Sequence, residues 1–486
     1  MLKRVGLLFL CLLMASTMLA GCKKEESVAS NEKLLWYARL NKQTANEEVF
    51  QKADEMVREK LGIGLDIVAL EDYNTKIQVI NASGEDYDIV YTSGTVNNYY
   101  KNVADENFLA LDELLPQYAP NLYKLFGEDV WDAVKVDGKI YGVVNQQIAA
   151  RAPCFYVPKQ NVELLGLDKE KYANASLADY EEYLRLVHEK TGSYTHMADF
   201  WTGGGEQVYG MELVNGSNLP GAIRIDEENP KIINQYETEE YKEYIKLRAK
   251  WVQEGLTSPM HVTESDLPKF ADYPEGEVVP WLGFCNTYMP GVENDYKTSY
   301  GIDVEILTKS RPILNGYSLT STMTAINSET KHPEKSVEFL EMLHTDKEFY
   351  NLIAFGIENK HYKKLTENRI EVIDKDAYSQ PVWAIANMFN AYLIEGQEDG
   401  IWEETKKINN EAKRSPVLGF SPNLDEIQLE VANCNAAMDE YLNVLNEGLM
   451  DVDTTYDAFI QKLKTAGCDE MIRKLNEQLD EWRSSK

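Results

Sequence analysis

The sequence predicts an α/β fold in which helices cover both faces of a parallel sheet. Between residues 34 and 91, strand-like and helix-like segments follow in the order strand, helix, strand, helix, strand. This alternation is typical of parallel strands joined by helical crossovers. Hydrophobic residues make up 44% of the chain and aromatic residues 10%, which is enough for sizeable cores. The 486 residues suggest two to four folded units, at about 100–200 residues each.

The expected strands are apolar runs bounded by polar residues. The first helix is expected to open at the capping-box pattern Thr44-x-x-Glu47 and to end at Gly62. In order, the elements are a strand at 34–38, a helix at 44–62, a strand at 63–70, a helix around Ile77 and Ile80, a strand at 86–91 and an Asp137-Gly138 hairpin over 136–143.

Polar and aromatic residues lie at the ends of the first and third strands. Tyr37 and Arg39 lie at the end of the first, and Tyr91, Thr92 and Ser93 at the end of the third. Ligands of parallel α/β sheets bind beyond the carboxyl ends of the strands. We therefore expect these five residues near one crevice.

The N-terminus has the pattern of a lipoprotein signal peptide. Lys3 and Arg4 precede an apolar run at 5–20, which is shorter than the roughly 20 apolar residues of a membrane span. Leu19-Ala20-Gly21-Cys22 then resembles a bacterial lipobox, in which Cys22 is acylated; an ordinary cleaved signal with an incidental cysteine is the alternative. We expect a signal peptide at 1–21, a tether at 22–33 and an extracytoplasmic chain anchored to the cell membrane by its N-terminal lipid.

Charge and cysteine content narrow the class of protein. A formal net charge of −31 argues against nucleic acid as a partner. The cysteines that follow Cys22 lack C-x-x-C spacing. We expect them to be free, largely buried thiols, with a Cys434–Cys468 bridge as the alternative. These cysteines are Cys154, Cys285, Cys434 and Cys468.

Catalytic signatures are missing from the sequence. It contains no G-x-x-x-x-G-K-[ST] and no H-E-x-x-H motif, and its six histidines lack metal-ligand spacing. Gly203-Gly204-Gly205 is expected to form a turn, because it lacks the surroundings of a phosphate loop. We therefore expect no enzyme, no cofactor and no metal. A glycosidase pair of carboxylates stays open as an alternative, because so acidic a chain contains many.

Several motifs, in order along the chain, resemble those of a known family. A strand ending in Asp88-Ile89-Val90 is followed by FLALDELL at 108–115 and VDGKIYGV at 136–143. This order resembles the extracellular solute-binding protein family 1, the maltodextrin-binding-protein-like receptors of bacterial ABC importers. The resemblance continues through 324–327, 331–340, 345–348 and 415–420, and its last part is similar to a branch with a characteristic C-terminal region. Amphipathic helices are expected in that region at 402–412, 424–445, 456–466 and 471–482.

The resemblance implies a periplasmic-binding-protein-like fold, with two α/β lobes, a ligand cleft between them and strands that cross at the hinge. We place lobe 1 at 34–145 and 309–347, and lobe 2 at 146–308 and 348–486. Such a receptor captures a solute by hinge closure and delivers it to the permease subunits of an ABC importer. We expect it to act as a monomer.

Aromatic residues point to the class of solute. The chain contains 29 Tyr, 8 Trp and 14 Phe, and sugars need aromatic faces beside planar polar groups. An oligosaccharide is therefore expected; a receptor for peptides or another polar solute, or an extracytoplasmic glycan-acting enzyme, is the alternative. In family relatives the positions of Trp281 and Tyr91 line the cleft, although any of these aromatics could instead belong to a core. The candidate ligand-binding residues are Tyr37, Arg39, Tyr91, Thr92, Ser93, Asn145, Gln146, Trp201, Trp281, Tyr317 and Trp383.

Overall fold

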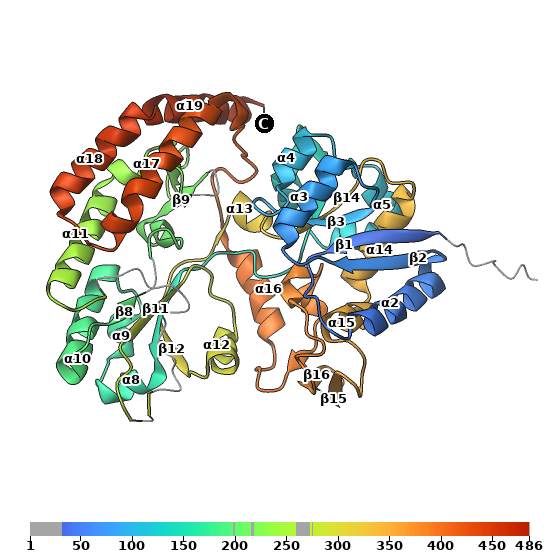
Figure 1. Cartoon of the computed structure of the whole chain (residues 1–486), viewed down its shortest axis with the longest axis horizontal. Coiled ribbons are helices and arrows are strands. Elements are labelled where there is room, and N and C mark those ends of the chain that lie inside the picture. Colours follow the sequence, from blue (N-terminus) through green and yellow to red (C-terminus); the bar gives the residue numbers. More distant parts are fainter. Residues whose placement is uncertain (1–31, 198–199, 215–217, 259–272, 275, 486) are drawn as a thin grey trace, which may run out of the picture.

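The computed structural model describes residues 32–197, 200–214, 218–258, 273–274 and 276–485. Two α/β lobes lie next to each other and are joined by segments that cross between them (Figure 1). The expected signal peptide at 1–21, Cys22 and all but the last two residues of the tether at 22–33 lie outside the described residues. Within the described part of the chain, no helix is long and apolar enough to span a membrane.

The first lobe contains a five-stranded sheet in the order β2-β1-β3-β14-β6. The three strands predicted near the N-terminus are parallel, with β1 between β2 and β3. The last two come from elsewhere in the chain, and β14 is antiparallel to both of its neighbours. The strands are β1 (Lys33–Ala38), β2 (Gly64–Ala69), β3 (Ile89–Thr92), β6 (Gly142–Val144) and β14 (Met323–Ile326).

Local sequence accounts for most of these elements, with one correction. Helix α2 (Asn46–Leu61) ends at Gly62, whose φ of 73° suits glycine. The expected capping box does not form, because the N-cap is Ala45 and no side chain caps the helix. Asp137 and Gly138 both have positive φ, 49° and 78°, as a tight hairpin turn requires. They join β4 (Lys135–Val136) to β5 (Lys139–Ile140).

Further helices cover the first sheet. They are α3 (Tyr73–Ser83), α4 (Tyr99–Ala104), α5 (Leu114–Tyr118), α6 (Pro120–Lys124), α7 (Glu128–Ala133), α14 (Pro333–Thr345) and α15 (Lys347–Phe355). Trp36 of β1 packs edge-on against Phe339 of α14, with ring centroids 5.5 Å apart. The core of this lobe therefore joins residues about 300 positions apart in the sequence.

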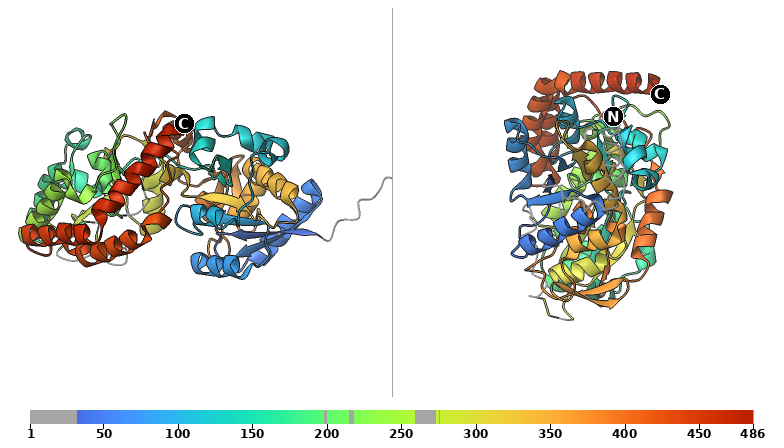
Figure 2. Two further views of the ribbon diagram at one scale, coloured as in Figure 1. Left: turned by 90° about the horizontal axis from the view of Figure 1, so that it is seen from above. Right: turned by 90° about the vertical axis from the view of Figure 1, so that its right-hand side faces the viewer.

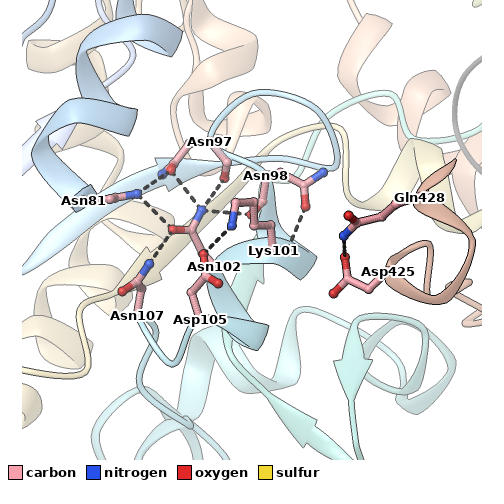
Figure 3. A network of polar contacts seen from close by, with 9 residues as sticks. All are labelled: Asn81, Asn97, Asn98, Lys101, Asn102, Asp105, Asn107, Asp425 and Gln428. Atoms are coloured by element: carbon pink, nitrogen blue, oxygen red, sulfur yellow. Dashed lines mark hydrogen bonds and ion pairs between the residues drawn. The ribbon is translucent and has the colours of Figure 1, made fainter. Parts of the chain in front are cut away.

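Asparagine side chains hold α4 in place (Figure 3). Asn81 Nδ2 donates to Asn97 Oδ1 and Asn102 Oδ1, each at 2.9 Å. Asn107 Nδ2 donates to Asn102 Oδ1 at 3.0 Å. This network of mutually satisfied amides fixes the face of α4 that packs on the lobe.

The second lobe contains a four-stranded sheet in the order β12-β7-β11-β8. Strand β7 is antiparallel to β11 and β12, and β8 is parallel to β11. Its elements are β7 (Cys154–Pro158), α8 (Lys159–Leu164), α9 (Lys169–Tyr172), η1 (Leu177–Tyr180), α10 (Glu181–Thr191), β8 (His196–Met197), η2 (Gly205–Tyr209), β9 (Met211–Leu213), β10 (Ala222–Arg224), η3 (Gln235–Glu237), α11 (Glu239–Gln253), β11 (Trp281–Cys285), α12 (Val292–Tyr300) and β12 (Val304–Lys309).

A helical C-terminal region completes the second lobe. After η8 (Asp425–Ile427), it consists of α17 (Gln428–Asn446), α18 (Val452–Thr465) and α19 (Cys468–Ser484). These helices share a core with α11 through buried residues such as Leu445, Phe459 and Leu475. Viewed from above, α19 runs from the second lobe toward the first, and its C-terminal end lies near α4 (Figures 1 and 2).

The chain crosses between the lobes along a narrow ribbon. Arg151 N donates to Ile313 O, and Ile313 N donates to Arg151 O, both at 2.8 Å. Ile313 and Leu314 form β13, which pairs in parallel with β18 (Lys413–Arg414). Ser415 N then donates to Leu314 O at 2.9 Å. The crossing segments are thus hydrogen-bonded to one another, which is the arrangement of a hinge.

The division between the lobes corrects the assignment of residues 348–412 to lobe 2, and leaves the rest of the predicted segment 348–486 there. The part up to residue 412 buries its apolar side chains in the first core, through residues such as Phe349, Ile353 and Trp402. Helical periodicity shows that a face is buried but not which lobe buries it. We therefore place 32–145 and about 314–412 in lobe 1, and the C-terminal region in lobe 2. The reassigned elements after α15 are β15 (Tyr362–Thr366), β16 (Arg369–Val372), η6 (Val382–Ala384), η7 (Met388–Asn390), β17 (Leu393–Ile394) and α16 (Ile401–Glu411).

The cysteines within the described residues are free. Cys154, Cys434 and Cys468 are buried, and Cys285 is half-buried. Cys154 and Cys285 are cross-strand partners of β7 and β11. Cys434 and Cys468 lie close enough for their thiols to hydrogen-bond, without the alternative bridge.

Candidate functional site

A cavity of about 270 Å³ opens next to the crossing ribbon. The second lobe provides one wall through η2, β9 and the turn before them, and the crossing segments provide the other. The lining residues are mostly polar: Arg151, Thr202, Gly203, Gly204, Glu206, Gln207, Met211, Glu212, Leu213, Asn218, Asn286, Asn315 and Tyr317.

The turn at Gly203-Gly204-Gly205, which the sequence predicted, positions η2 at the cavity. Gly204 has a φ of 103°, and a Cβ there would lie 3.0 Å from the Asn286 side chain. A Cβ on Gly205 would lie 2.5 Å from the carbonyl oxygen of Phe200. Only glycine allows both the backbone conformation and these close approaches. The turn thereby brings the polar side chains of η2 and β9 to the hinge.

Two buried carboxyl groups line this wall. Glu206 and Glu212 are each only 7% exposed. Burial raises the pKa of Glu206 to about 7, and the charge of Arg151 only partly offsets it. Burial also raises the pKa of Glu212 to about 7, against a hydrogen bond from Ser415 and the charge of Arg151. Near neutral pH each group can therefore either accept or donate a hydrogen bond.

Arg151 and Tyr317 form the opposite wall. The guanidinium carbon lies 4.4 Å from the centroid of the tyrosine ring, a cation–π contact. Tyr317 belongs to α13 (Gly316–Leu319), and Asn315 Oδ1 caps this helix by accepting from Ser318 N at 2.8 Å. Gln207 Nε2 donates to Arg151 O at 2.9 Å, which ties the two walls together.

A second polar and aromatic group lies at the carboxyl ends of β1 and β3. The guanidinium carbon of Arg39 lies 5.2 Å from the ring centroid of Tyr91 and 5.0 Å from that of Trp383. Arg39 Nη1 also donates to the Tyr91 hydroxyl at 3.0 Å. Tyr91 is buried, whereas Trp383 is 38% exposed. We call these three residues the Arg39 cluster. Strand β1 runs toward the other lobe, so the cluster lies on the inner side of its lobe (Figure 1).

Other predicted residues at the strand ends and the hinge serve the interior of the first lobe. The Tyr37 hydroxyl donates to Glu85 at 2.7 Å, and Thr92 Oγ1 donates to the Asn97 carbonyl at 2.5 Å. Ser93 Oγ accepts from Val96 N at 2.8 Å. These contacts anchor the strand ends and the turn after β3.

Asn145 and Gln146 begin the first crossing segment. Buried Asn145 Nδ2 donates to Ala384 O at 3.1 Å. Gln146 Nε2 donates to Leu125 O at 3.3 Å. Both residues therefore connect the ribbon to the first lobe, outside the lining of the cavity.

The structure does not bring two of the predicted tryptophans to the cavity. Trp201 is 2% exposed and packs edge-on against Tyr241, with ring centroids 4.8 Å apart. Trp281 is also 2% exposed and packs edge-on against Tyr156 at 4.9 Å. Their roles as ligand contacts stay predictions. An apolar run ending in tryptophan looks the same in sequence whether the ring enters a core or faces a cleft.

Sequence reasoning missed most of the cavity. Of the eleven predicted residues, Tyr317 lines it, and Arg39, Tyr91 and Trp383 meet in the Arg39 cluster. The usable signal was the glycine turn followed by Glu206, Gln207 and Glu212, because polar residues after a tight turn are typical of a ligand wall. Among the described residues, no group of three or more His, Cys, Asp or Glu side chains could hold a metal ion.

Comparison with known sequences finds relatives across almost the whole chain. Residues 416–484 match the family described as a domain of unknown function, DUF3502. A carbohydrate ABC transporter substrate-binding protein from Streptococcus pneumoniae is 27% identical to this chain. The match covers 96% of this chain and 94% of the relative. Lipoprotein LipO from Bacillus subtilis is 22% identical over 83% of each chain.

Solved structures show the same fold. The crystal structure of the N-glycan transport solute-binding protein from Streptococcus pneumoniae is 25% identical, with a TM-score of 0.79 over 94% of this chain and 99% of that one. Its complex with Man1GlcNAc gives a TM-score of 0.70, at 24% identity over 93% of this chain and 99% of that one. Its complex with Man5GlcNAc gives 0.66, at 25% identity over 94% and 99%.

Proposed function

We propose that this chain, which belongs to the solute-binding proteins of ABC importers, captures an oligosaccharide in the cavity beside its hinge and delivers it to the permease. The observation that supports this most is the position of the cavity, at the crossing ribbon and between walls from different parts of the chain. A ligand there contacts the second lobe and the crossing segments, so its binding is coupled to movement of the hinge.

The chemistry of the lining suits a sugar. Sugar hydroxyls need donors and acceptors in fixed planes, which amide and carboxyl side chains provide. The lining offers these groups at Gln207, Asn218 and Asn286 as well as at the two glutamates. The ring of Tyr317 offers an aromatic face for the C–H side of a sugar. The similar proteins named for carbohydrate and N-glycan transport agree with this choice.

Hinge closure adds the first lobe to the site. The TM-score to the N-glycan transport protein is 0.79 for the structure named without a ligand and lower, 0.70 and 0.66, for its two glycan complexes. This difference supports the view that the two lobes of this chain are arranged more as in the structure named without a ligand than as in the two glycan complexes. In the closed state we expect the exposed ring of Trp383 to approach the cavity. There it would contact the part of a longer glycan that extends out of the cavity.

The receptor is held at the membrane by lipid on Cys22. The support comes from the lipobox-like sequence and from the relative named as a lipoprotein. We further propose that the protein binds its sugar without turnover, because the similar proteins are named as substrate-binding proteins.

Calorimetry with a panel of ligands tests the proposal. The panel contains mannose-, glucose- and galactose-ending disaccharides, Man5GlcNAc and a set of short peptides. We expect at least one oligosaccharide to bind with a one-to-one ratio and to be recovered intact. Binding of peptides alone would favour the peptide receptor, and release of shorter sugars would favour a glycan-acting enzyme.

A further inference from the structure

The cavity contains more negative than positive side chains. Among its lining residues, Arg151, Glu206 and Glu212 are the charged ones, and the others are uncharged polar or apolar. The carboxyl groups come from neighbouring elements of one wall, η2 and β9, and both are buried. A ligand in this cavity therefore meets two buried carboxyl groups and one guanidinium.

The single guanidinium is already engaged. It lies against the ring of Tyr317 at 4.4 Å, while Arg151 is held in the ribbon by its backbone bonds to Ile313. Its charge lowers the pKa of both glutamates, but burial raises each pKa by more. Arg151 therefore does not neutralise both carboxyl groups.

Glu212 has an acceptor that the described residues leave unused. The Ser415 hydroxyl hydrogen-bonds to this carboxyl group, yet Oε2 is buried and has no hydrogen-bond partner among the described residues. A buried acceptor without a partner destabilises the protein, and a ligand hydroxyl or amine in the cavity would supply the missing hydrogen bond.

We propose that this cavity selects the uncharged, hydroxyl-rich end of a glycan and rejects a sugar that carries a carboxylate. The inference rests on the proposed function and names the class of sugar at the same site. A hydroxyl donates to Glu206 or Glu212 without adding charge. A carboxylate brings a third negative group to the two buried ones already there, and like charges close together repel one another.

Protonation of the two glutamates weakens this rejection. The groups facing Glu206 are Arg151 and its own backbone amide, and those facing Glu212 are Ser415, Arg151 and Glu206. Because the pKa of each glutamate is about 7, both are mostly charged at about pH 8 and mostly neutral at about pH 5.5. Discrimination should therefore be stronger at the higher pH.

Matched pairs of sugars test the inference by calorimetry. Each mannose-, glucose- or galactose-ending disaccharide is compared with its counterpart whose terminal C6 hydroxymethyl group is oxidised to a carboxylate. At about pH 8 we expect the wild-type protein to bind the neutral member at least about tenfold more tightly. At about pH 5.5, a pH below the pKa of both glutamates, the ratio should shrink severalfold.

Variants identify the cause of the ratio. The double variant Glu206→Gln with Glu212→Gln keeps shape and hydrogen-bonding capacity but removes both charges, so its ratio at about pH 8 should fall toward one. Glu170→Gln, at an exposed position of α9, is the matched control and should keep the wild-type ratio. If the double variant does not fold, the wild-type ratios at the two pH values decide the question.

The outcomes separate the two proposals. If no sugar of any pair binds, the proposed function fails and this inference falls with it. If sugars bind but the wild type shows no preference for the neutral member at about pH 8, the inference is overturned and the function stands. A wild-type ratio that persists unchanged in the double variant also overturns it.

Discussion

The guanidinium carbon of Arg151 lies 4.4 Å from the ring centroid of Tyr317. This contact joins the first crossing segment to α13, the helix that follows the second crossing segment. It fixes the ring beside the cavity and links the ligand site to the hinge. Tyr317 was predicted from the sequence as a ligand contact, whereas Arg151 was not.

Removing the ring of Tyr317 should weaken sugar binding more than folding. Tyr317→Ala deletes a half-buried stacking surface, worth about 0.5–1.5 kcal/mol for an aromatic contact, and frees Arg151. We expect a loss of affinity of about tenfold in calorimetry, with a small change in melting temperature. Tyr194→Ala removes a tyrosine that is 37% exposed outside the cavity, and it should leave affinity unchanged. Equal losses in both variants would contradict a specific role for Tyr317.

Trp281 and Trp383 should respond to alanine in opposite ways. Trp281 is 2% exposed, so its replacement leaves a cavity and should cost about 3–5 kcal/mol of stability. Trp383 is 38% exposed, so its replacement should cost little stability but reduce affinity for longer glycans. Thermal unfolding and calorimetry on both variants measure the contrast. Normal stability of Trp281→Ala with reduced affinity would instead place Trp281 among the ligand contacts.

The buried glutamates should make stability depend on pH in a defined direction. Burial raises the pKa of each from 4.5 to about 7, so the folded state binds protons more tightly than the unfolded chain. Stability is lost as pH rises through this interval, by about 1.4 kcal/mol per pH unit for each group. The Glu206→Gln, Glu212→Gln variant should therefore be more stable than wild type at about pH 8 and similar at about pH 4.5.

Urea unfolding at the two pH values measures this difference, and comparison with wild type cancels the titration of other groups. Glu170→Gln should match wild type at both pH values. A double variant less stable than wild type at about pH 8 would mean that the ionised carboxylates are stabilised by contacts beyond those described.

Contacts between residues 414–421, which lead into the C-terminal region, and the first lobe should limit how far the lobes separate. Arg414 Nε lies 3.1 Å from Asp129 of α7, and the Tyr100 hydroxyl hydrogen-bonds to Ser421. Gly419 has a φ of 88°, and a Cβ there would lie 3.2 Å from Ala133 Cα. Gly419→Ala should therefore push the segment around residue 419 away from α7 of the first lobe.

Solution scattering tests this by a larger radius of gyration for Gly419→Ala. Gly192→Ala is the matched control, because its φ of 67° brings similar backbone strain with no atom within 4 Å of the new Cβ. Asp425 lies opposite Lys101 in the same region (Figure 3). The hydrogen bond to Asp105 is the main cause that raises the pKa of Lys101, and the negative charge of Asp425 raises it further. Identical scattering from Gly419→Ala and wild type would exclude this restraint.

Replacing Cys22 should release the protein from the membrane. Cys22→Ala removes the thiol that the lipobox-like sequence offers for acylation, and stable anchoring needs the acyl chains. We expect the variant in the soluble fraction and without incorporated labelled fatty acid. A variant that stays as firmly bound as wild type would disprove lipidation at Cys22.

The sequence by itself determined the parallel start of the first sheet, the Asp137-Gly138 hairpin and the resemblance of its motifs to those of solute-binding proteins. Each of these depends on local order: strand and helix periods, the residues that turns require and the spacing of short motifs. The helices near the C-terminus were also predictable, within a few residues at their ends, since their apolar stripes are strong.

Only the tertiary structure decided which lobe holds residues 348–412, which aromatic rings are buried and which polar residues meet at the hinge. Periodicity shows that one face of an element is covered, but the covering surface is set by contacts between distant segments. Trp281 and Tyr317 were both predicted as ligand contacts, yet one packs in a core and the other lines the cavity. Burial is the main cause of the raised pKa of Glu206 and of Glu212, and no local sequence pattern encodes burial.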